Sequence, residues 1–194
     1  MIAIIDYDAG NVKSVQNALK KLGFEAVITS DIEMIKNADK VIFPGVGEAS
    51  SAMKKLKERG LDAVIPNLKQ PVLGICLGMQ LMCNASEEGN TKALGIFDCE
   101  VKLFPNSDIV PHMGWNNVAE IKGKLLENIS ENDNFYFVHS YYAEIGESTT
   151  SVCDYITPFS ATLEKDNFYA AQFHPEKSGD AGFKLLENFL NVRF

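Results

Sequence analysis

The fold is decided by the stretch Pro71-Val72-Leu73-Gly74-Ile75-Cys76-Leu77-Gly78-Met79-Gln80. Its apolar run predicts a short buried strand that turns sharply at Cys76 and continues as a helix. Gly74 and Gly78 lie two residues before and two residues after the cysteine, in the pattern Gly-x-nucleophile-x-Gly. The backbones of the strand and the helix approach each other too closely there for a Cβ, which the two glycines lack. We also expect a strained backbone conformation at Cys76. The stretch therefore predicts a strand, a sharp turn and a helix, with Cys76 at the tip of the turn as a candidate nucleophile.

A second interpretation of the same stretch is structural. Cysteine is among the most buried residue types, so Cys76 could simply fill a tight corner between strand and helix. The pattern alone leaves both interpretations open, and a partner residue elsewhere in the chain has to decide between them.

Composition limits the classes of protein to consider. The 194 residues predict one domain, 1–194, with a sizeable core. The net charge of −8, without a basic cluster, disfavours nucleic acid as a partner. The chain lacks a secretory n-region and any apolar run long enough for a bilayer, which disfavours a membrane and favours a cytoplasmic protein. The four cysteines lack zinc-ligand spacing, so we expect reduced thiols and neither a metal nor a cofactor.

The first half of the chain alternates between strand and helix patterns. Strands are predicted at 2–6, 26–29, 40–43 and 72–75, and helices at 12–22, 31–35, 48–58 and from 76 onward. Such alternation predicts an α/β fold with a mostly parallel central sheet and helices on both faces. Functional sites in these sheets lie at the carboxyl ends of strands, where both Cys76 and residues 44–47 fall.

The second half has a different character. Segments 93–104, 118–121 and 135–142 are predicted as added antiparallel strands. Residues 111–116 lack a regular period and predict either a loop packed under Trp115 or a contact surface. A closing helix is expected from about Ser178, with Ser178 or Asp180 as its cap. Its predicted buried stripe consists of Phe183, Leu186, Phe189 and Leu190.

The partner residue for Cys76 is predicted near the end of the chain. His174 follows an apolar strand at 167–173, and Glu176 comes two residues later. In an extended segment, residues i and i+2 point to the same side, so Glu176 can orient the His174 imidazole. Together with Cys76 these residues make a nucleophile, a base and an orienting carboxylate. His112 and His139 have no such acidic neighbour and are predicted to be non-catalytic.

Two of these motifs resemble a known family. Gly74–Gln80 and Phe173–Ser178 are similar to the class I, or triad, glutamine amidotransferases. Three further stretches narrow the resemblance to the glutaminase subunit of imidazole glycerol phosphate synthase in histidine biosynthesis: Pro44–Gly47, Pro111–Asn116 and Tyr136–Tyr142. The resemblance extends over essentially the whole chain.

The resemblance implies that the chain hydrolyses L-glutamine to glutamate and ammonia. Cys76 would be the nucleophile, His174 the base and Glu176 its orienting partner. Matching family positions also imply an oxyanion site at Val46, Gly47 and Leu77, and glutamine-binding residues at Gln80, Ser140 and Tyr141.

The resemblance also implies a partner. In the family, ammonia passes to a (β/α)₈-barrel cyclase subunit in a heterodimer. The cyclase forms imidazole glycerol phosphate and an aminoimidazole carboxamide ribonucleotide. Positions that match the family's subunit interface are Asn11, Trp115, Tyr136 and Lys177.

Departures from the family pattern leave the partner open. Asp8 stands where family members commonly have glycine, and Glu48-Ala49-Ser50 replaces a small residue followed by an aromatic one. The alternatives are a glutaminase serving another amidotransferase complex, a cysteine peptidase or related hydrolase, and an inactive regulatory binding subunit. The spacing of His174 and Glu176 and the presence of Gln80 disfavour the hydrolases, and the complete triad disfavours an inactive subunit.

Overall fold

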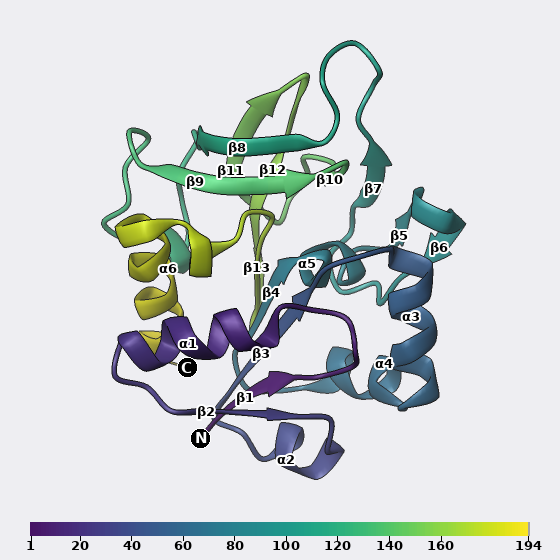
Figure 1. Ribbon diagram of the computed structural model, residues 1–194, viewed down its shortest axis with the longest axis vertical. Helices are drawn as coiled ribbons and strands as arrows, with labels where there is room; N and C mark the ends of the chain where they lie inside the picture. Colours follow the sequence, from purple (N-terminus) through teal and green to yellow (C-terminus); the bar gives the residue numbers. More distant parts are fainter. Residues whose placement is uncertain (194) are drawn as a thin grey trace.

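The computed structural model describes residues 1–193, and its centre is a seven-stranded sheet (Figure 1). The strand order is β11-β12-β13-β4-β3-β1-β2. Strands β2, β1, β3, β4 and β13 are parallel, and β12 and β11 are antiparallel additions at one edge. The strands are β1 (Ile2–Ile5), β2 (Ala26–Thr29), β3 (Lys40–Gly45), β4 (Val72–Cys76), β11 (Thr149–Tyr155), β12 (Thr157–Lys165) and β13 (Phe168–Ala171). The predicted fold class is confirmed.

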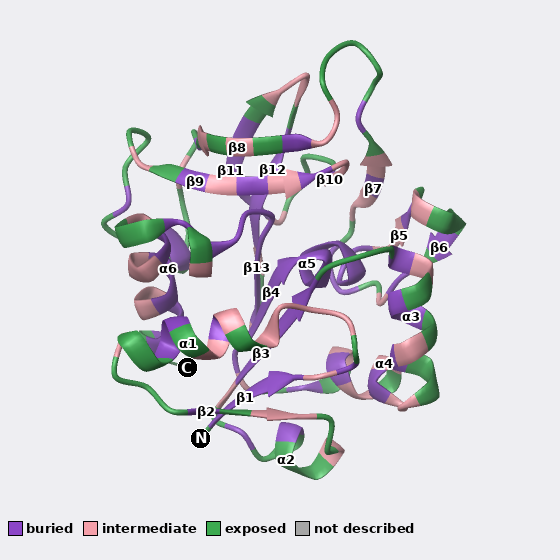
Figure 2. Cartoon of the chain, viewed as in Figure 1, coloured by how far each residue is buried: buried purple, intermediate pink, exposed green. Residues whose placement is uncertain are grey.

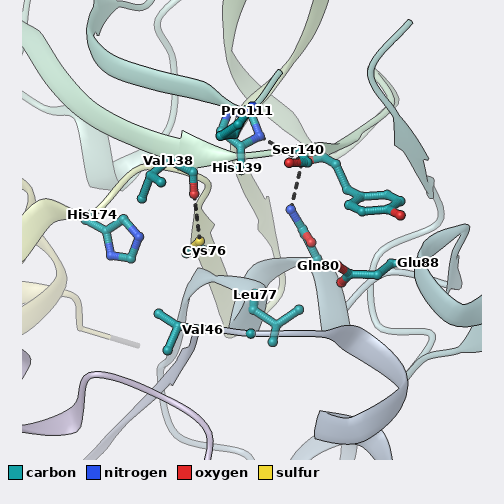
Figure 3. A pocket seen from close by; sticks show the side chains of 12 residues that line it. Val46, Cys76, Leu77, Gln80, Glu88, Pro111, Val138, His139, Ser140 and His174 are labelled. Carbon is teal, nitrogen blue, oxygen red and sulfur yellow. Dashed lines mark hydrogen bonds between the residues drawn. The ribbon is translucent and has the colours of Figure 1, made fainter. Parts of the chain in front are cut away.

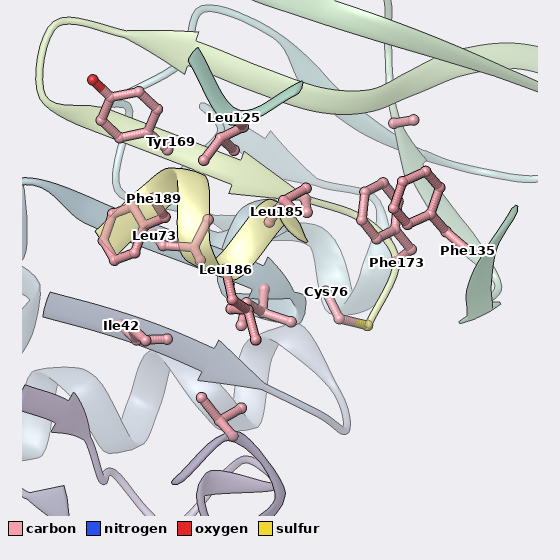
Figure 4. Close-up of a cluster of buried hydrophobic side chains, with 14 of the residues drawn as sticks. Ile42, Leu73, Cys76, Leu125, Phe135, Tyr169, Phe173, Leu185, Leu186 and Phe189 are labelled. Atoms are coloured by element: carbon pink, nitrogen blue, oxygen red, sulfur yellow. The ribbon is translucent and has the colours of Figure 1, made fainter. Parts of the chain in front are cut away.

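Helices cover both faces of this sheet because the buried strands are apolar on both sides. Adjacent residues such as Ile4 and Ile5 belong to two different core clusters, as the period of two in a strand requires. Helices α1 (Val12–Lys21) and α6 (Gly179–Asn191) pack into one cluster (Figure 4). The other cluster receives α2 (Ile32–Lys36), α3 (Ala49–Glu58), α4 (Leu61–Val64) and α5 (Leu77–Leu81).

Two smaller sheets lie beyond the central one. The first contains β10 (Tyr141–Ala143), β7 (Glu100–Leu103), β5 (Ala85–Ser86) and β6 (Thr91–Lys92). The second pairs β8 (His112–Asn117) with β9 (Asn134–His139) across the carboxyl ends of the parallel strands (Figure 1). Short 3₁₀ turns complete the chain: η1 (Ile65–Asn67), η2 (Glu88–Asn90), η3 (Lys124–Leu126) and η4 (Pro175–Lys177).

The predicted strand boundaries in the middle of the chain are wrong. Only residues 100–103 of the segment 93–104 form a strand, because the backbone N–H groups of Gly95, Ile96 and Phe97 bond to carbonyls just after α5. The segment 118–121 makes a single bridge between Ala119 and Val152. The segment 135–142 divides after His139 into β9 and β10, which belong to different sheets.

Residues 111–116 were expected to be irregular, but they form most of β8. Its exposed residues include the large apolar Met113 and Trp115, and its buried residue is His112. This inverts the usual alternation of apolar inside and polar outside, and the sequence pattern therefore conceals the strand. Trp115 is 59% exposed, so the alternative prediction of a loop packed under this residue is wrong as well. Figure 2 shows most of β8 in the exposed and intermediate colours.

Helix α6 begins close to the predicted position, but no side chain caps its first turn. Ser178 occupies the N-cap position, yet its hydroxyl accepts the Tyr136 N–H and donates to the His174 carbonyl instead of capping the helix. Asp180 lies inside the first turn and is not the cap. Phe183 is only half-buried, and Leu185 takes its place in the buried stripe.

The turn from β4 into α5 requires its glycines. A Cβ on Gly78 would lie 1.9 Å from the carbonyl oxygen of Phe43 on β3. A Cβ on Gly74 would lie 2.7 Å from Met82 Sδ and 3.0 Å from the Met79 nitrogen. Because Cβ atoms do not approach backbone this closely, only glycine lets α5 lie against the edge of β3 and β4.

We predict that Gly78→Ala destabilises the fold by about 1–3 kcal/mol, because β3 or α5 must shift to make room for the Cβ. Denaturant unfolding measures the change. The matched control is Gly146→Ala, where an added Cβ would meet only the Asp98 carbonyl at 3.7 Å, and where we expect a change within about 0.5 kcal/mol. Equal effects at the two positions would contradict the role given to Gly78.

Candidate active site

Cys76 ends β4 in a strained conformation, as predicted. Its φ of 53° and ψ of −113° lie in a region that non-glycine residues rarely adopt. Such a residue costs about 1–3 kcal/mol, which the surrounding packing has to offset. The side chain is nearly buried, and its thiol points toward the Val138 carbonyl oxygen, with the sulfur 4.0 Å away (Figure 3).

A cavity of about 320 Å³ opens beside this thiol. Its size is at the lower end of the range for small-molecule sites. Most of the wall comes from the segment after β3, the turn from β4 into α5, and the β9–β10 junction, and Glu88, Pro111 and His174 complete it (Figure 3). The lining residues are Val46, Gly47, Cys76, Leu77, Gln80, Glu88, Pro111, Val138, His139, Ser140, Tyr141 and His174.

His174 lies on one side of Cys76, and a buried carboxylate holds its ring. Nδ1 of His174 donates to Glu176 Oε1 at 2.8 Å, and both side chains are buried. The pairing was predicted, but the extended geometry was wrong, because Glu176 lies in the 3₁₀ turn η4. The backbone N–H of His174 donates to the Tyr136 carbonyl, which anchors the turn to β9. Nε2 has no hydrogen-bond partner among residues 1–193 and remains available for a reacting atom.

The pKa of His174 results from two opposing effects. Burial by itself lowers it, but the interactions of the ring with Cys76 and Glu176 outweigh burial and raise the pKa to about 10. At neutral pH His174 therefore carries a positive charge beside the thiol. An imidazolium in this place stabilises negative charge on sulfur and can deliver a proton to a leaving group.

The residues expected to form the oxyanion site surround Cys76. Gly45 at the end of β3 is paired in register with Cys76, so the following Val46 and Gly47 lie beside the nucleophile. Gly47 has a φ of +101°, and both residues are exposed. Leu77 starts α5 directly after the nucleophile. All three line the cavity.

The residues expected to bind glutamine line the same cavity. Gln80 projects from α5, and its Nε2 donates to the Tyr141 carbonyl at 2.9 Å and to Gln172 Oε1 at 2.9 Å. Ser140 and Tyr141 line the same cavity from the junction of β9 and β10. The fold thus brings Gln80 together with two residues that lie about sixty positions later in the sequence.

Two further polar residues of the site were missed by sequence reasoning. Glu88 is the one carboxylate lining the cavity among the described residues, and burial raises its pKa. Nothing in its neighbourhood in the sequence distinguishes it from Glu87. Gln172 had a visible signal, because it is the one polar residue at the end of the apolar segment before His174.

His112 and His139 form a neutral pair above the cavity. His139 Nδ1 lies 2.7 Å from the Tyr141 carbonyl and must donate to it, so His139 Nε2 accepts from His112 Nδ1 at 2.9 Å. Burial lowers the pKa of His112 to about 4 and that of His139 to about 3. Neither ring is charged at neutral pH, and the prediction that they are non-catalytic stands as a prediction.

Three of the four expected interface residues share one edge of the molecule. Trp115 and Tyr136 are paired across β8 and β9, with ring centroids 6.0 Å apart. Lys177 is exposed next to Ser178, whose hydroxyl bonds to Tyr136. Asn11 lies apart from them, where its side chain caps α1. It faces a small space that is also lined by Val46 and Glu176.

The two departures from the family pattern have local structural explanations. Asp8 has a φ of 61°, a conformation that favours glycine, and its carboxylate pairs with Arg59. Glu48 caps helix α3 by accepting the Ser50 and Ser51 N–H groups. Neither residue contacts Cys76 or His174.

Searches against known proteins agree on one family. The family described as "Glutamine amidotransferase class-I" matches residues 3–192. A protein of Bacteroides fragilis (strain YCH46) named imidazole glycerol phosphate synthase subunit HisH is 59% identical, over 98% of this chain and 99% of its own. A protein of Methanococcus maripaludis named imidazole glycerol phosphate synthase subunit HisH 2 is 49% identical, over 98% of each chain.

Solved structures share the fold at much lower identity. A crystal structure of a glutamine amidotransferase has a TM-score of 0.75 at 20% identity and covers 98% of this chain and 97% of its own. The structure of PurLQS from Thermotoga maritima has a TM-score of 0.73 at 16% identity, with the same coverage.

Among residues 1–193, no helix is long and apolar enough to cross a membrane, and no cluster of three or more His, Cys, Asp or Glu residues could hold a metal ion.

The raised pKa of His174 predicts how stability depends on pH. The interactions of the protonated ring with Cys76 and Glu176 stabilise the fold fully below about pH 6.5, and the stabilisation is lost as pH rises through about 10. The free energy of unfolding of Glu176→Gln should therefore fall furthest below that of the native chain near pH 6, with the difference shrinking toward pH 10. Denaturant titrations across this range test it. Glu187→Gln, at a surface ion pair with Lys184, is the control and should show no such trend.

Proposed function

Because the chain belongs to the glutamine amidotransferase class-I family, and within it to the HisH subunits of imidazole glycerol phosphate synthase, we propose that residues 1–194 act as one glutaminase domain. It hydrolyses L-glutamine and passes the ammonia to a cyclase subunit in histidine biosynthesis. One observation supports this most strongly: Cys76, His174 with Glu176, and Gln80 converge on a single cavity at the carboxyl ends of β3 and β4.

The proposed chemistry begins with attack of the Cys76 thiolate on the side-chain amide carbon of glutamine. The carbonyl oxygen becomes an oxyanion, for which the donors are the Leu77 N–H and an N–H of the Val46–Gly47 segment. His174 then gives its proton to the amide nitrogen, and ammonia leaves. A γ-glutamyl thioester remains on Cys76. Water, deprotonated by His174, hydrolyses the thioester and releases glutamate.

Glutamine recognition needs groups for both ends of the substrate. Gln80, Ser140 and Tyr141 are assigned to it on their family positions and on their place in the cavity wall. We add Glu88 for the positively charged α-amino group, because it is the one carboxylate in the wall among the described residues. Glu88 Oε2 already accepts the Ala49 N–H at 2.8 Å, which holds the carboxylate in place and leaves Oε1 for the substrate.

The cyclase is proposed to dock on the edge formed by Trp115, Tyr136 and Lys177, with Asn11 completing the contact. Trp115 is a large exposed aromatic residue, the half-buried Tyr136 lies beside it, and aromatic residues are enriched in protein interfaces. Lys177 directly follows Glu176, so that docking there acts on the turn that holds His174. A closed complex would also keep ammonia from escaping into water, where it is protonated at neutral pH.

The test of this function is glutamate release from L-glutamine by the chain alone and by its complex with the cyclase and the cyclase's nucleotide ligand. We expect weak activity alone and strong activity in the complex. Cys76→Ala should abolish glutamate release, because no other group can form the thioester, while fold and cyclase binding are retained. Ammonia release by that variant, or equal activity with and without the cyclase, would refute the corresponding part of the proposal.

A second prediction concerns the substrate's amino group. Glu88→Gln removes the charge but keeps an oxygen for the Ala49 N–H, so it should raise KM for glutamine about 10- to 100-fold with little change in kcat. Steady-state kinetics in the cyclase complex measure both constants. The control is Glu87→Gln, whose carboxylate bonds instead to the Leu103 N–H and Lys102. An unchanged KM in Glu88→Gln would remove Glu88 from the binding site.

A further inference from the structure

Gln172 is a fully buried amide immediately after β13, in a segment that is otherwise apolar. Its backbone N–H continues the sheet by donating to the Ala161 carbonyl at 2.8 Å. Burying an amide without partners costs about 1–3 kcal/mol, whereas an apolar side chain of the same shape would cost nothing of this kind. The polarity of Gln172 therefore has to be explained by what its side chain contacts.

The contacts fix which way the amide points. Gln80 Nε2 donates to the Tyr141 carbonyl, which can only accept, so the nitrogen end of Gln80 is assigned unambiguously. The same Nε2 donates to Gln172 at 2.9 Å, so the Gln172 atom facing it must be the oxygen Oε1. The nitrogen Nε2 of Gln172 is then the atom that faces Cys76 Sγ, at 3.8 Å.

Two different groups therefore approach the Cys76 sulfur in the resting chain. The thiol hydrogen points toward the Val138 carbonyl, and Gln172 Nε2–H points at the sulfur itself. The Val138 carbonyl can interact only with the protonated thiol. The Gln172 N–H gains strength when the sulfur becomes negative, because hydrogen bonds to ionised acceptors are shorter and stronger.

We propose that Gln172 is a further catalytic residue of the glutaminase site. Its amide N–H donates to the Cys76 sulfur whenever that sulfur carries negative charge, and its amide oxygen holds Gln80 in the orientation that receives glutamine. The first role operates twice in the proposed reaction. The sulfur is negative before it attacks the substrate, and it becomes negative again when water displaces it from the thioester. This inference rests on the proposed function for its kinetics, but the contact with the sulfur is independent of it.

The main test is Gln172→Met, which keeps the side-chain length and removes both the donor and the acceptor. Iodoacetamide alkylation of Cys76, followed by peptide mass spectrometry over a range of pH without glutamine, reports ionisation of the thiol. We expect the pH midpoint of alkylation to rise by about one unit or more. In the cyclase complex, kcat should fall about 10- to 100-fold, and KM should rise because Gln80 is no longer held.

The matched control is Thr162→Val on β12, next to the Ala161 carbonyl that receives the Gln172 N–H. It removes buried hydrogen bonds to Thr150 and Ser151, and so lowers stability, but it does not face the sulfur. Its alkylation midpoint and kcat should equal those of the native chain. A purely structural Gln172 would make the two variants behave alike, which would overturn the proposal.

A measurement on the unaltered chain covers the case in which Gln172→Met does not fold. The side-chain ¹⁵N–¹H₂ signal of Gln172, followed by NMR, should shift with the same pH midpoint as alkylation of Cys76, and a signal that does not move would refute the contact.

The proposed glutaminase function and the proposed role of Gln172 can be refuted separately. Native chain that shows the NMR and alkylation behaviour but releases no glutamate in any complex would refute the glutaminase function and leave the contact standing.

Discussion

The close approach of α5 to the end of β3 is the constraint on which the rest of the structure depends. A carbonyl oxygen of Phe43 occupies the space where any side chain at position 78 would be, so the chain leaves β4 in a single turn. That turn forces Cys76 into its strained conformation and holds its sulfur at the edge of the sheet. The pairing of Gly45 with Cys76 then places the Val46–Gly47 segment beside the nucleophile. The positions of the nucleophile and of the Val46–Gly47 segment are thus a consequence of one packing contact.

The parts of the fold that the sequence predicted correctly are those governed by local chemistry. The apolar runs of β1, β3 and β4 are buried on both faces, so each predicts a strand without knowledge of its neighbours. The prediction failed at β8 because the pattern of apolar and polar residues in this strand depends on its tertiary partners. His112 is buried against Tyr155 and Phe137, while the apolar Trp115 faces outward on a surface proposed to meet another chain. An interface strand does not show the alternation of a strand in a monomer.

The site likewise contains residues that local sequence predicts and residues that only the tertiary fold identifies. Cys76 and the pair of His174 and Glu176 were predictable because each lies in a short motif whose geometry is local, even though η4 replaced the expected extended segment. Glu88 could not be predicted, since only the tertiary fold distinguishes its carboxylate from that of Glu87. Gln172 was predictable in principle, because a single polar residue in a buried apolar segment needs a partner.

Burial also assigns the charges around the cavity. Of the three histidines, His112 and His139 are kept neutral because each is desolvated without a carboxylate partner, whereas the interactions of His174 with Cys76 and the buried Glu176 keep it protonated. Positive charge therefore lies at the Cys76 end of the cavity, and the carboxylate of Glu88 is a separate negative group in its wall. L-Glutamine is complementary to this arrangement, because its amide oxygen becomes negative at the end where its carbon is attacked and its ammonium lies at the other end. The length of the side chain between them then becomes part of the recognition, since a shorter amide would satisfy one charged group only by leaving the other unpaired.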